Sequence, residues 1–351
     1  MRRVSRIAVA GVATATLTAA LAACGGTSND AASSSSGDGK SKGVALAYDV
    51  GGKGDQSFND AATAGMEKAA ADFKYGSKAV EPTDGESDAD KTQRLATLAK
   101  AGYNPVIGVG YAYAPAVAEA AEKFPDTTFG IVDDETIDKK NVADMVFHEE
   151  QASYLAGVAA ALTTKSKTVG FVGGVDIPLI HKFEAGYKQG VADTNPKVKV
   201  VSQFLTEKAE DGGFASPDKG KTAAEGQIED GADVVYHAAG LSGQGVIEAA
   251  AAAKAWAIGV DSDQYSQDAL KAYKQYILTS ATKDVAGAVY NLAKSVQDGK
   301  PETGVVRASL KTGGVGLADS NPEFKGNAKL QEALKKATDG INDGTIKVKT
   351  S

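Results

Sequence analysis

The chain has 351 residues, a formal net charge of −7 and a single cysteine. An acidic balance without a basic cluster argues against nucleic acid as a partner, and one cysteine excludes a disulfide within the chain. Roughly 300 residues follow the N-terminal segments described next, which suffices for two lobes of ordinary domain size.

The first 23 residues predict a lipoprotein signal peptide. Arg2, Arg3 and Arg6 give a basic start, and the uncharged run Ile7–Ala23 is typical of a secretory core because it is short for a membrane span. Small residues directly before Cys24 resemble a bacterial lipobox, which implies cleavage there and lipid on the thiol and amine. The alternative is an ordinary signal peptide with an incidental cysteine. Loss of the three arginines changes the formal charge from −7 to −10.

Residues 24–42 predict a flexible tether. The segment Thr27–Lys42 is rich in Ser, Gly, Asp and Lys and has almost nothing apolar, so it cannot bury a core. No later stretch is long and apolar enough to cross a bilayer. We therefore expect a protein that is anchored by lipid on Cys24 to the outer face of a bacterial cell membrane, and whose folded part starts near Gly43.

Strands and helices alternate along the rest of the chain. Short apolar runs predict strands at 44–48, 105–109, 128–132, 168–172, 198–204, 234–237 and 257–260. Amphipathic segments predict helices at 59–73, 90–101, 114–124, 151–162, 180–193, 219–230 and 245–255. This alternation favours an α/β fold of parallel sheets with helices on both faces.

Two segments of the chain, 95–134 and 223–263, repeat one pattern. Each contains a helix, a glycine, a strand, a small or polar turn, a second helix and a second strand that ends at an aspartate. The glycine and the aspartate are 31 positions apart in the first segment and 30 in the second. Two copies of one α/β unit predict two similar lobes.

Aspartates follow three of the predicted strands, at Asp49, Asp133 and Asp261. In open parallel sheets, ligands bind beyond the carboxyl ends of the strands. Each aspartate alone is typical of a turn or a helix cap, but three at equivalent positions favour a shared ligand cleft.

The sequence contains no convincing set of catalytic or metal-binding residues. His148, His181 and His237 lack metal-ligand spacing, and no nucleophile elbow or zinc-protease motif is present. The glycines of residues 51–54 follow a strand but lack the register of a phosphate-binding loop, so a flexible turn is the better interpretation. We expect no enzyme activity, no cofactor and no metal.

Binding chemistry fits these residues better. Phe58 and Phe183 each stand near a predicted helix start, one in each half of the chain, where two aromatic faces can enclose a flat ring. Ionised aspartates accept hydrogen bonds from vicinal hydroxyls. Lys283 follows a short strand; it can donate to ligand oxygens and balance the aspartates, or be an ordinary surface lysine.

Four motifs then occur together and in order: Asp49–Asn59, Phe183–Gly186, Ala239–Gly245 and Ile258–Tyr265. With them the chain resembles, over roughly residues 44–317, the basic membrane protein family of bacterial lipoproteins. The best understood members of that family are purine-nucleoside receptors of ABC importers. The resemblance implies a type I periplasmic-binding-protein fold with two Rossmann-like lobes and a three-stranded hinge.

The resemblance also implies roles for single residues. It places Phe58 and Phe183 on the two faces of a purine, with Asn59 and Asp133 at the edge of the base. The groups that hold the sugar or close the site, together with the glycines whose backbone lines it, are Asp49, Asp261, Lys283, Gly240 and Gly243. The choice among adenosine, guanosine and inosine stays open, because the glycine turn carries Leu241 and Gln244 where family members can differ.

By this resemblance, lobe 1 consists of residues 43–147 plus about 262–282, and lobe 2 of about 148–261 plus 283–351. The implied function is capture of a purine nucleoside by a monomer and its delivery to an ABC permease. Alternatives are a ligand sensor for a signalling partner, and a binder of a sugar or another small polar metabolite.

Overall fold

A computed structural model describes residues 41–351, which form one compact unit. The predicted signal peptide, Cys24 and the tether up to residue 40 lie outside the described residues. Ser41 and Lys42, expected in the tether, are already part of the fold: the Ser41 hydroxyl donates to the Asn104 carbonyl, and the Lys42 N–H to the Gly102 carbonyl. Because this unit has its own hydrophobic core, it has what a domain needs to fold alone.

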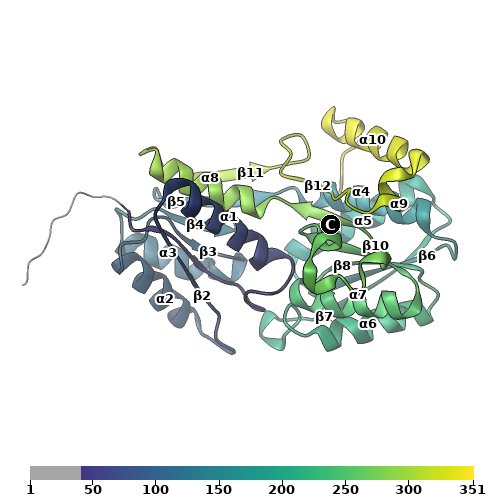
Figure 1. The fold of residues 1–351 in the computed structure, drawn as a ribbon, viewed down its shortest axis with the longest axis horizontal. Helices are drawn as coiled ribbons and strands as arrows, with labels where there is room; N and C mark the ends of the chain where they lie inside the picture. The colour runs from purple at the N-terminus through teal and green to yellow at the C-terminus, as the bar shows by residue number, and fades with distance from the viewer. Residues whose placement is uncertain (1–40) are drawn as a thin grey trace, which may run out of the picture. The chain divides into compact units, whose positions relative to one another are not determined.

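The first sheet has six strands in the order β11-β5-β4-β3-β1-β2, and its neighbours are all parallel (Figure 1). Its strands are β1 (Gly43–Ala47), β2 (Gly76–Val80), β3 (Val106–Gly108), β4 (Phe129–Val132), β5 (Val142–Phe147) and β11 (Gly304–Ala308). Helices α1 (Phe58–Phe73) and α8 (Val285–Gln297) pack on one face. Helices α2 (Asp88–Lys100) and α3 (Ala114–Lys123) pack on the other. Strand β1 is buried at every position, as expected for a strand covered on both faces.

The second sheet repeats this plan in the order β12-β10-β9-β8-β6-β7, with only β12 antiparallel to its neighbour. Its strands are β6 (Thr168–Val175), β7 (Lys199–Thr206), β8 (Val234–Ala238), β9 (Trp256–Asp261), β10 (Ile277–Lys283) and β12 (Val315–Leu317). Helices α4 (Glu149–Thr163) and α5 (Pro178–Thr194) cover one face. Helices α6 (Pro217–Glu229) and α7 (Gly243–Ala253) lie on the other side (Figure 1).

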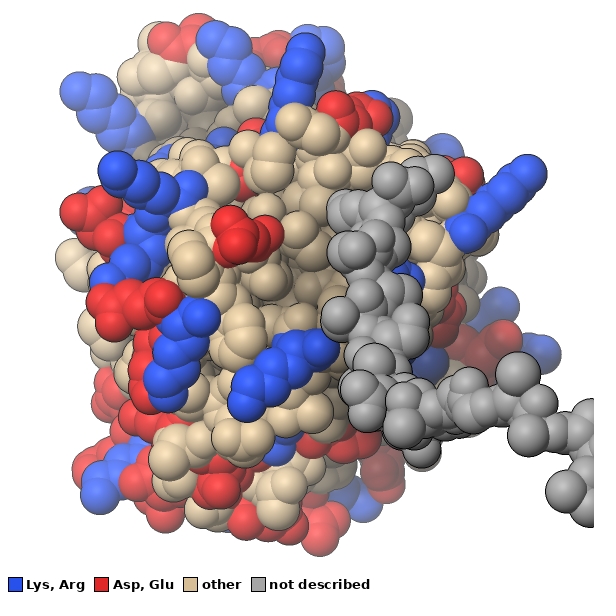
Figure 2. Space-filling view, turned by 90° about the vertical axis from the view of Figure 1, so that its left-hand side faces the viewer, with Lys and Arg blue, Asp and Glu red and all other residues tan. Residues whose placement is uncertain are grey.

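The C-terminal helices α9 (Pro322–Gly326) and α10 (Ala328–Asn342) complete the second lobe, where their apolar side chains join the same core as α4. Short 3-10 turns lie at Tyr111–Tyr113, Ala209–Asp211, Gly240–Ser242, Gln264–Ser266, Asp268–Leu270 and Lys274–Tyr276. No helix within residues 41–351 is both long and apolar enough to cross a membrane. On the face shown in Figure 2, acidic and basic side chains are interspersed where the grey atoms leave the surface visible.

The chain crosses between the lobes three times: after β5, after β10, and between β11 and β12. The expected α/β fold with two lobes is confirmed. The residue ranges expected for the two lobes, however, differ from the ranges that make up the two sheets. Strand β10 was expected in lobe 1, yet it extends the second sheet beside β9. Helix α8 and strand β11 were expected in lobe 2, yet they belong to the first lobe, where β11 pairs with β5.

The packing of α8 has a local cause in α1. A Cβ atom at Gly65 would lie 2.3 Å from the carbonyl oxygen of Ala286, so only glycine lets the two helices approach this closely. This close contact holds α8 against α1 in the first lobe, to which the chain returns directly after Lys283.

Candidate functional site

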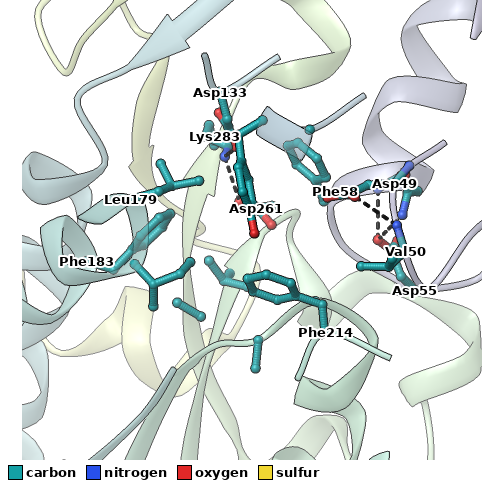
Figure 3. A pocket seen from close by; sticks show the side chains of 18 residues that line it. Asp49, Val50, Asp55, Phe58, Asp133, Leu179, Phe183, Phe214, Asp261 and Lys283 are labelled. Atoms are coloured by element: carbon teal, nitrogen blue, oxygen red, sulfur yellow. Dashed lines mark hydrogen bonds and ion pairs between the residues drawn. The ribbon is translucent and has the colours of Figure 1, made fainter. Parts of the chain in front are cut away.

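A pocket lies between the two lobes, at the carboxyl ends of their strands, as expected for parallel sheets (Figure 3). Its space amounts to about 520 Å³, the open mouth included. The first lobe lines it with Asp49, Val50, Asp55, Phe58, Asn59, Gly110, Tyr111 and Asp133. The second lobe lines it with Leu179, Ile180, Phe183, Phe214, Ala238, Ala239, Gly240, Val260, Asp261 and Lys283.

The fold thus brings eight of the nine expected ligand-binding residues to one pocket. Gly243 is the exception, because it lies at the start of α7 against the ring of His237, where a Cβ atom would come within 2.0 Å of Cε1. Its lack of a side chain makes room for a buried histidine next to the site, and its backbone does not line the pocket.

Asp133 and Asp261 reach the pocket through the same backbone conformation. Asp133 directly follows the central strand β4, and Asp261 is the last residue of the central strand β9. Each has a left-handed φ, 69° at Asp133 and 61° at Asp261. Aspartate tolerates this region better than most residues. The repeated unit seen in the sequence therefore presents one carboxylate from each lobe.

Lys283 lies between these two carboxylates. Its Nζ is 2.6 Å from Asp133 Oδ2 and 3.6 Å from Asp261 Oδ1, and the three side chains are at most 9% exposed. Burial alone would lower the pKa of Lys283, but Asp133 and Asp261, together with Glu149, outweigh it and raise that pKa above its usual value. Lys283 is therefore charged, and it joins the two lobes through the ion pair with Asp133.

Three aromatic rings surround the same ammonium group. Its nitrogen is 4.6 Å from the ring centroid of Phe58, 5.4 Å from that of Phe147 and 5.7 Å from that of Phe183. Such cation–π contacts stabilise a desolvated cation. Figure 3 shows Phe58 and Phe183 on opposite sides of the pocket, with Lys283 between them.

The carboxyl groups at this site outnumber the hydrogen-bond donors that face them. Asp133 Oδ1 and Asp261 Oδ1 are buried without a hydrogen-bond partner, as is Oε2 of nearby Glu149. Burial raises the pKa of Asp133 in spite of the lysine. The two unpartnered aspartate oxygens can accept hydrogen bonds from hydroxyl or N–H groups of a bound molecule.

Asn59 and Asp55 form hydrogen bonds that stabilise the first-lobe wall of the pocket. The Asn59 Oδ1 atom accepts the Asp49 N–H at 3.0 Å, and its Nδ2 donates to Asp55 Oδ2 at 3.2 Å. The Asp55 carboxylate also accepts the N–H groups of Ser57, Asn59 and Asp60 at the start of α1. Asn59 therefore has one N–H left for a ligand, and Asp55 has a structural role that the sequence reasoning missed.

Asp49 is a carboxylate of the first lobe that is more exposed than Asp55. It is half-buried, and its Oδ1 accepts the N–H of Val50 at 2.9 Å. Burial raises the pKa of Asp49 to about 7. Burial raises the pKa of Asp55 only to about 6, because the backbone N–H groups of Asn59, Ser57 and Asp60 donate to its carboxylate. Asp49 can thus accept or donate near neutral pH, in keeping with a position at the pocket edge.

Phe214 is the main pocket residue that the sequence reasoning missed. Its ring rests on Gly174, where a Cβ atom would lie 2.4 Å from ring carbon Cδ1, and it lines the pocket from below in Figure 3. The signal was present, because Phe214 is an isolated aromatic in a polar, glycine-rich loop, as Phe58 is. Tyr111 and Leu179 also line the pocket.

Comparison with known proteins identifies the protein family of this chain. Residues 42–350 match the model of a family described as Bmp, ABC transporter substrate-binding protein PnrA-like. The chain belongs to the Bmp family. The resemblance seen in the sequence is thereby confirmed, and the role of the chain is that of an ABC-transporter substrate-binding protein, which is a binding role and not an enzymatic one.

Similar proteins agree with this assignment. The Bmp-family chain is 34% identical to "ABC transporter nucleoside-binding protein BmpA" of Lactococcus lactis, over 97% of this chain and 98% of that protein. It is also 34% identical to "Uncharacterized lipoprotein PH1714" of Pyrococcus horikoshii, over 80% of this chain and 70% of that protein. A solved solute-binding protein of an Aeropyrum pernix ABC transporter has 28% identity and a TM-score of 0.76, and covers 88% of this chain and 93% of its own. The expected type I binding-protein fold is thus confirmed.

Glu149 makes the stability of this Bmp-family protein depend on pH. Burial, and next the charge of Asp133, raises its pKa to about 8, although Lys283 and Lys182 act in the opposite direction. A carboxyl whose pKa is higher in the folded than in the unfolded protein stabilises the fold while it is protonated, and this contribution is lost as the pH rises through that pKa. We expect Glu149→Gln to lose less stability than the parent between pH 5 and pH 8 in denaturant titrations.

The same substitution at exposed Glu332 in α10 is the control, and it should leave the decline with pH unchanged. A decline in Glu149→Gln as steep as in the parent would show that this carboxyl does not carry the effect.

Proposed function

We propose that this Bmp-family protein is a lipid-anchored receptor that captures purine nucleosides outside the cell membrane and delivers them to an ABC importer. The observation that carries the proposal is the composition of the pocket. It has aromatic rings from both lobes, which suit a flat base, and unpartnered carboxylate oxygens, which suit the hydroxyls of a sugar.

The base lies between Phe58 of the first lobe and Phe214 of the second in this proposal. Stacking needs an open ring face, and both of these side chains are partly exposed. Phe183, which the sequence suggests as the second ring, is only 5% exposed and belongs to the hydrophobic core. Its proposed role is an apolar wall beside Lys283.

The sugar hydroxyls donate to Asp133 Oδ1 and Asp261 Oδ1, and Lys283 supplies the compensating charge. The edge of the base meets Asp49 and the free N–H of Asn59. The backbone of Gly240 lines the same pocket, and its φ of 53° is left-handed.

Anchoring is the second part of the proposal. It rests on the lipobox-like sequence before Cys24 and on the lipoprotein named among the relatives. A tether outside the compact unit would leave the pocket free to load away from the membrane and then meet the permease.

Calorimetry tests which small molecules the protein binds. Residues 25–351, which keep the whole compact unit, are titrated with adenosine, guanosine and inosine, and with ribose as a competitor. We expect heat of binding from at least one nucleoside and no competition from ribose at equal concentration. Absence of heat from all three nucleosides would refute the purine proposal, and displacement by ribose would favour a sugar receptor.

A further inference from the structure

Three of the four motifs noted in the sequence meet across the cleft. The loop of residues 54–57, in the first lobe, is hydrogen-bonded to residues of the second lobe that lie about 200 positions later in the chain. These contacts lie beside the pocket and do not use its unpartnered oxygens. They therefore join the two lobes directly, with no ligand between them.

Ser57 contacts the second lobe through its hydroxyl and through its backbone carbonyl. Its fully buried hydroxyl lies 2.9 Å from Asp261 Oδ2 and 3.1 Å from the Val260 carbonyl oxygen. Its own carbonyl accepts the hydroxyl of Ser262 at 2.8 Å. Separation of the lobes would break all three contacts at once.

The two carboxylate oxygens of Asp261 have different surroundings. Oδ2 accepts from Ser57 across the cleft, whereas Oδ1 has no hydrogen-bond partner and lies 3.6 Å from the ammonium of Lys283. One carboxylate therefore contacts the opposite lobe and also offers an acceptor to the pocket. A ligand that orders this side chain also orders the contact with Ser57.

Gln264 makes a second contact between the lobes, and hydrogen bonds within its own lobe orient its side chain. Its Oε1 accepts the Val260 N–H at 3.1 Å and lies 3.0 Å from His237 Nε2, and its backbone N–H donates to the Ser280 hydroxyl at 3.1 Å. Because Oε1 is an acceptor, His237 contributes its Nε2–H. The amide orientation is thereby fixed, and Nε2 points across the cleft to the Gln56 carbonyl at 3.2 Å.

We propose that Ser57 and Gln264 are positioning residues that form a latch between the lobes, and that Asp261 links this latch to ligand binding. The latch is defined as the contacts of Ser57 and Gln264 with the opposite lobe. The ligand part of the inference rests on the proposed function, but the latch itself does not. A group that contributes only to the closed form slows ligand release, because the ligand leaves after the lobes open.

The test uses residues 25–351, which lack Cys24 and so contain no cysteine. Cysteines replacing exposed Lys100 in α2 and Glu229 in α6 carry a donor and an acceptor dye that report the distance between lobes. The variants are Ser57→Ala, which removes the hydroxyl, and Gln264→Glu, which keeps the acceptor but replaces the donor to Gln56. The matched control is Ser266→Ala, which removes a serine-to-aspartate hydrogen bond within the second lobe.

We expect both latch variants to shift toward longer distances between the lobes, and to release nucleoside about ten- to hundredfold faster. Ser266→Ala should match the parent. Folded Ser57→Ala protein with the parent's distances and release rate would overturn the latch, even if Gln264→Glu fails to fold. If no nucleoside binds the parent, the proposed function fails, and the distances without ligand still decide for or against the latch.

Discussion

Replacing Lys283 by methionine should lower the free energy of unfolding by about 3–5 kcal/mol at pH 8 and remove ligand binding. The substitution keeps the length of the side chain but leaves Asp133, Asp261 and Glu149 buried without their shared cation. A buried carboxylate without a partner is costly, because the interior does not solvate it as water does. Denaturant unfolding and calorimetry measure the two effects.

Acid should restore part of the lost stability. Without the lysine, the pKa values of Asp133 and Glu149 rise further above their usual range, so these buried carboxyls take up protons as the pH falls and lose their unbalanced charge. The defect should therefore be smaller at pH 5. The control is Lys294→Met, which breaks an exposed pair with Asp298 and should change stability little at either pH. A defect of equal size at both pH values would show that lost packing, and not unbalanced charge, is the cause.

Phe58→Ala and Phe214→Ala should each weaken nucleoside binding by about five- to hundredfold, because a stacked base contributes about 1–3 kcal/mol. Phe183→Ala should act differently. Its ring is in the core, so its loss should cost about 3–5 kcal/mol of stability. Calorimetry and unfolding on the same three variants separate the two kinds of effect.

Phe124→Ala is the matched control, since Phe124 is partly buried in the first lobe but does not line the pocket. It should lower stability and leave affinity unchanged. If Phe183→Ala weakens binding as much as Phe58→Ala while Phe214→Ala does not, the base lies between Phe58 and Phe183, as the sequence motifs suggest.

Much of the fold could be read from local patterns. Strands such as β1 are apolar without interruption, because both faces of a parallel sheet are covered, and this composition is visible in any short window. Strands β2 and β5 were missed. The residues of β2 are largely exposed and its sequence, GSKAV, has no apolar run. Strand β5 is buried throughout, but Asp144 interrupts its apolar residues. The aspartates Asp133 and Asp261 could be found because they end equivalent strands of a repeated unit.

Residues whose role depends on a distant partner could not be found in this way. Phe214 lines the pocket from a loop that packs on Gly174 of β6, whereas Gly243 lies against His237 of β8 and does not line the pocket. The latch joins Ser57 to Asp261, more than 200 positions away. No local window contains both members of such a pair.

The amino-acid sequence by itself determined the α/β alternation, the two similar lobes and the aspartates at the strand ends, because each follows from short-range hydrophobic pattern and turn chemistry. Only the tertiary structure decided that β10 joins the second lobe while α8 and β11 return to the first. That choice depends on which strand edge and which helix face are free to pair, and a strand's own residues do not specify its neighbour. The same long-range pairing sets Lys283 between the two carboxylates, at a point where the chain passes from one lobe to the other.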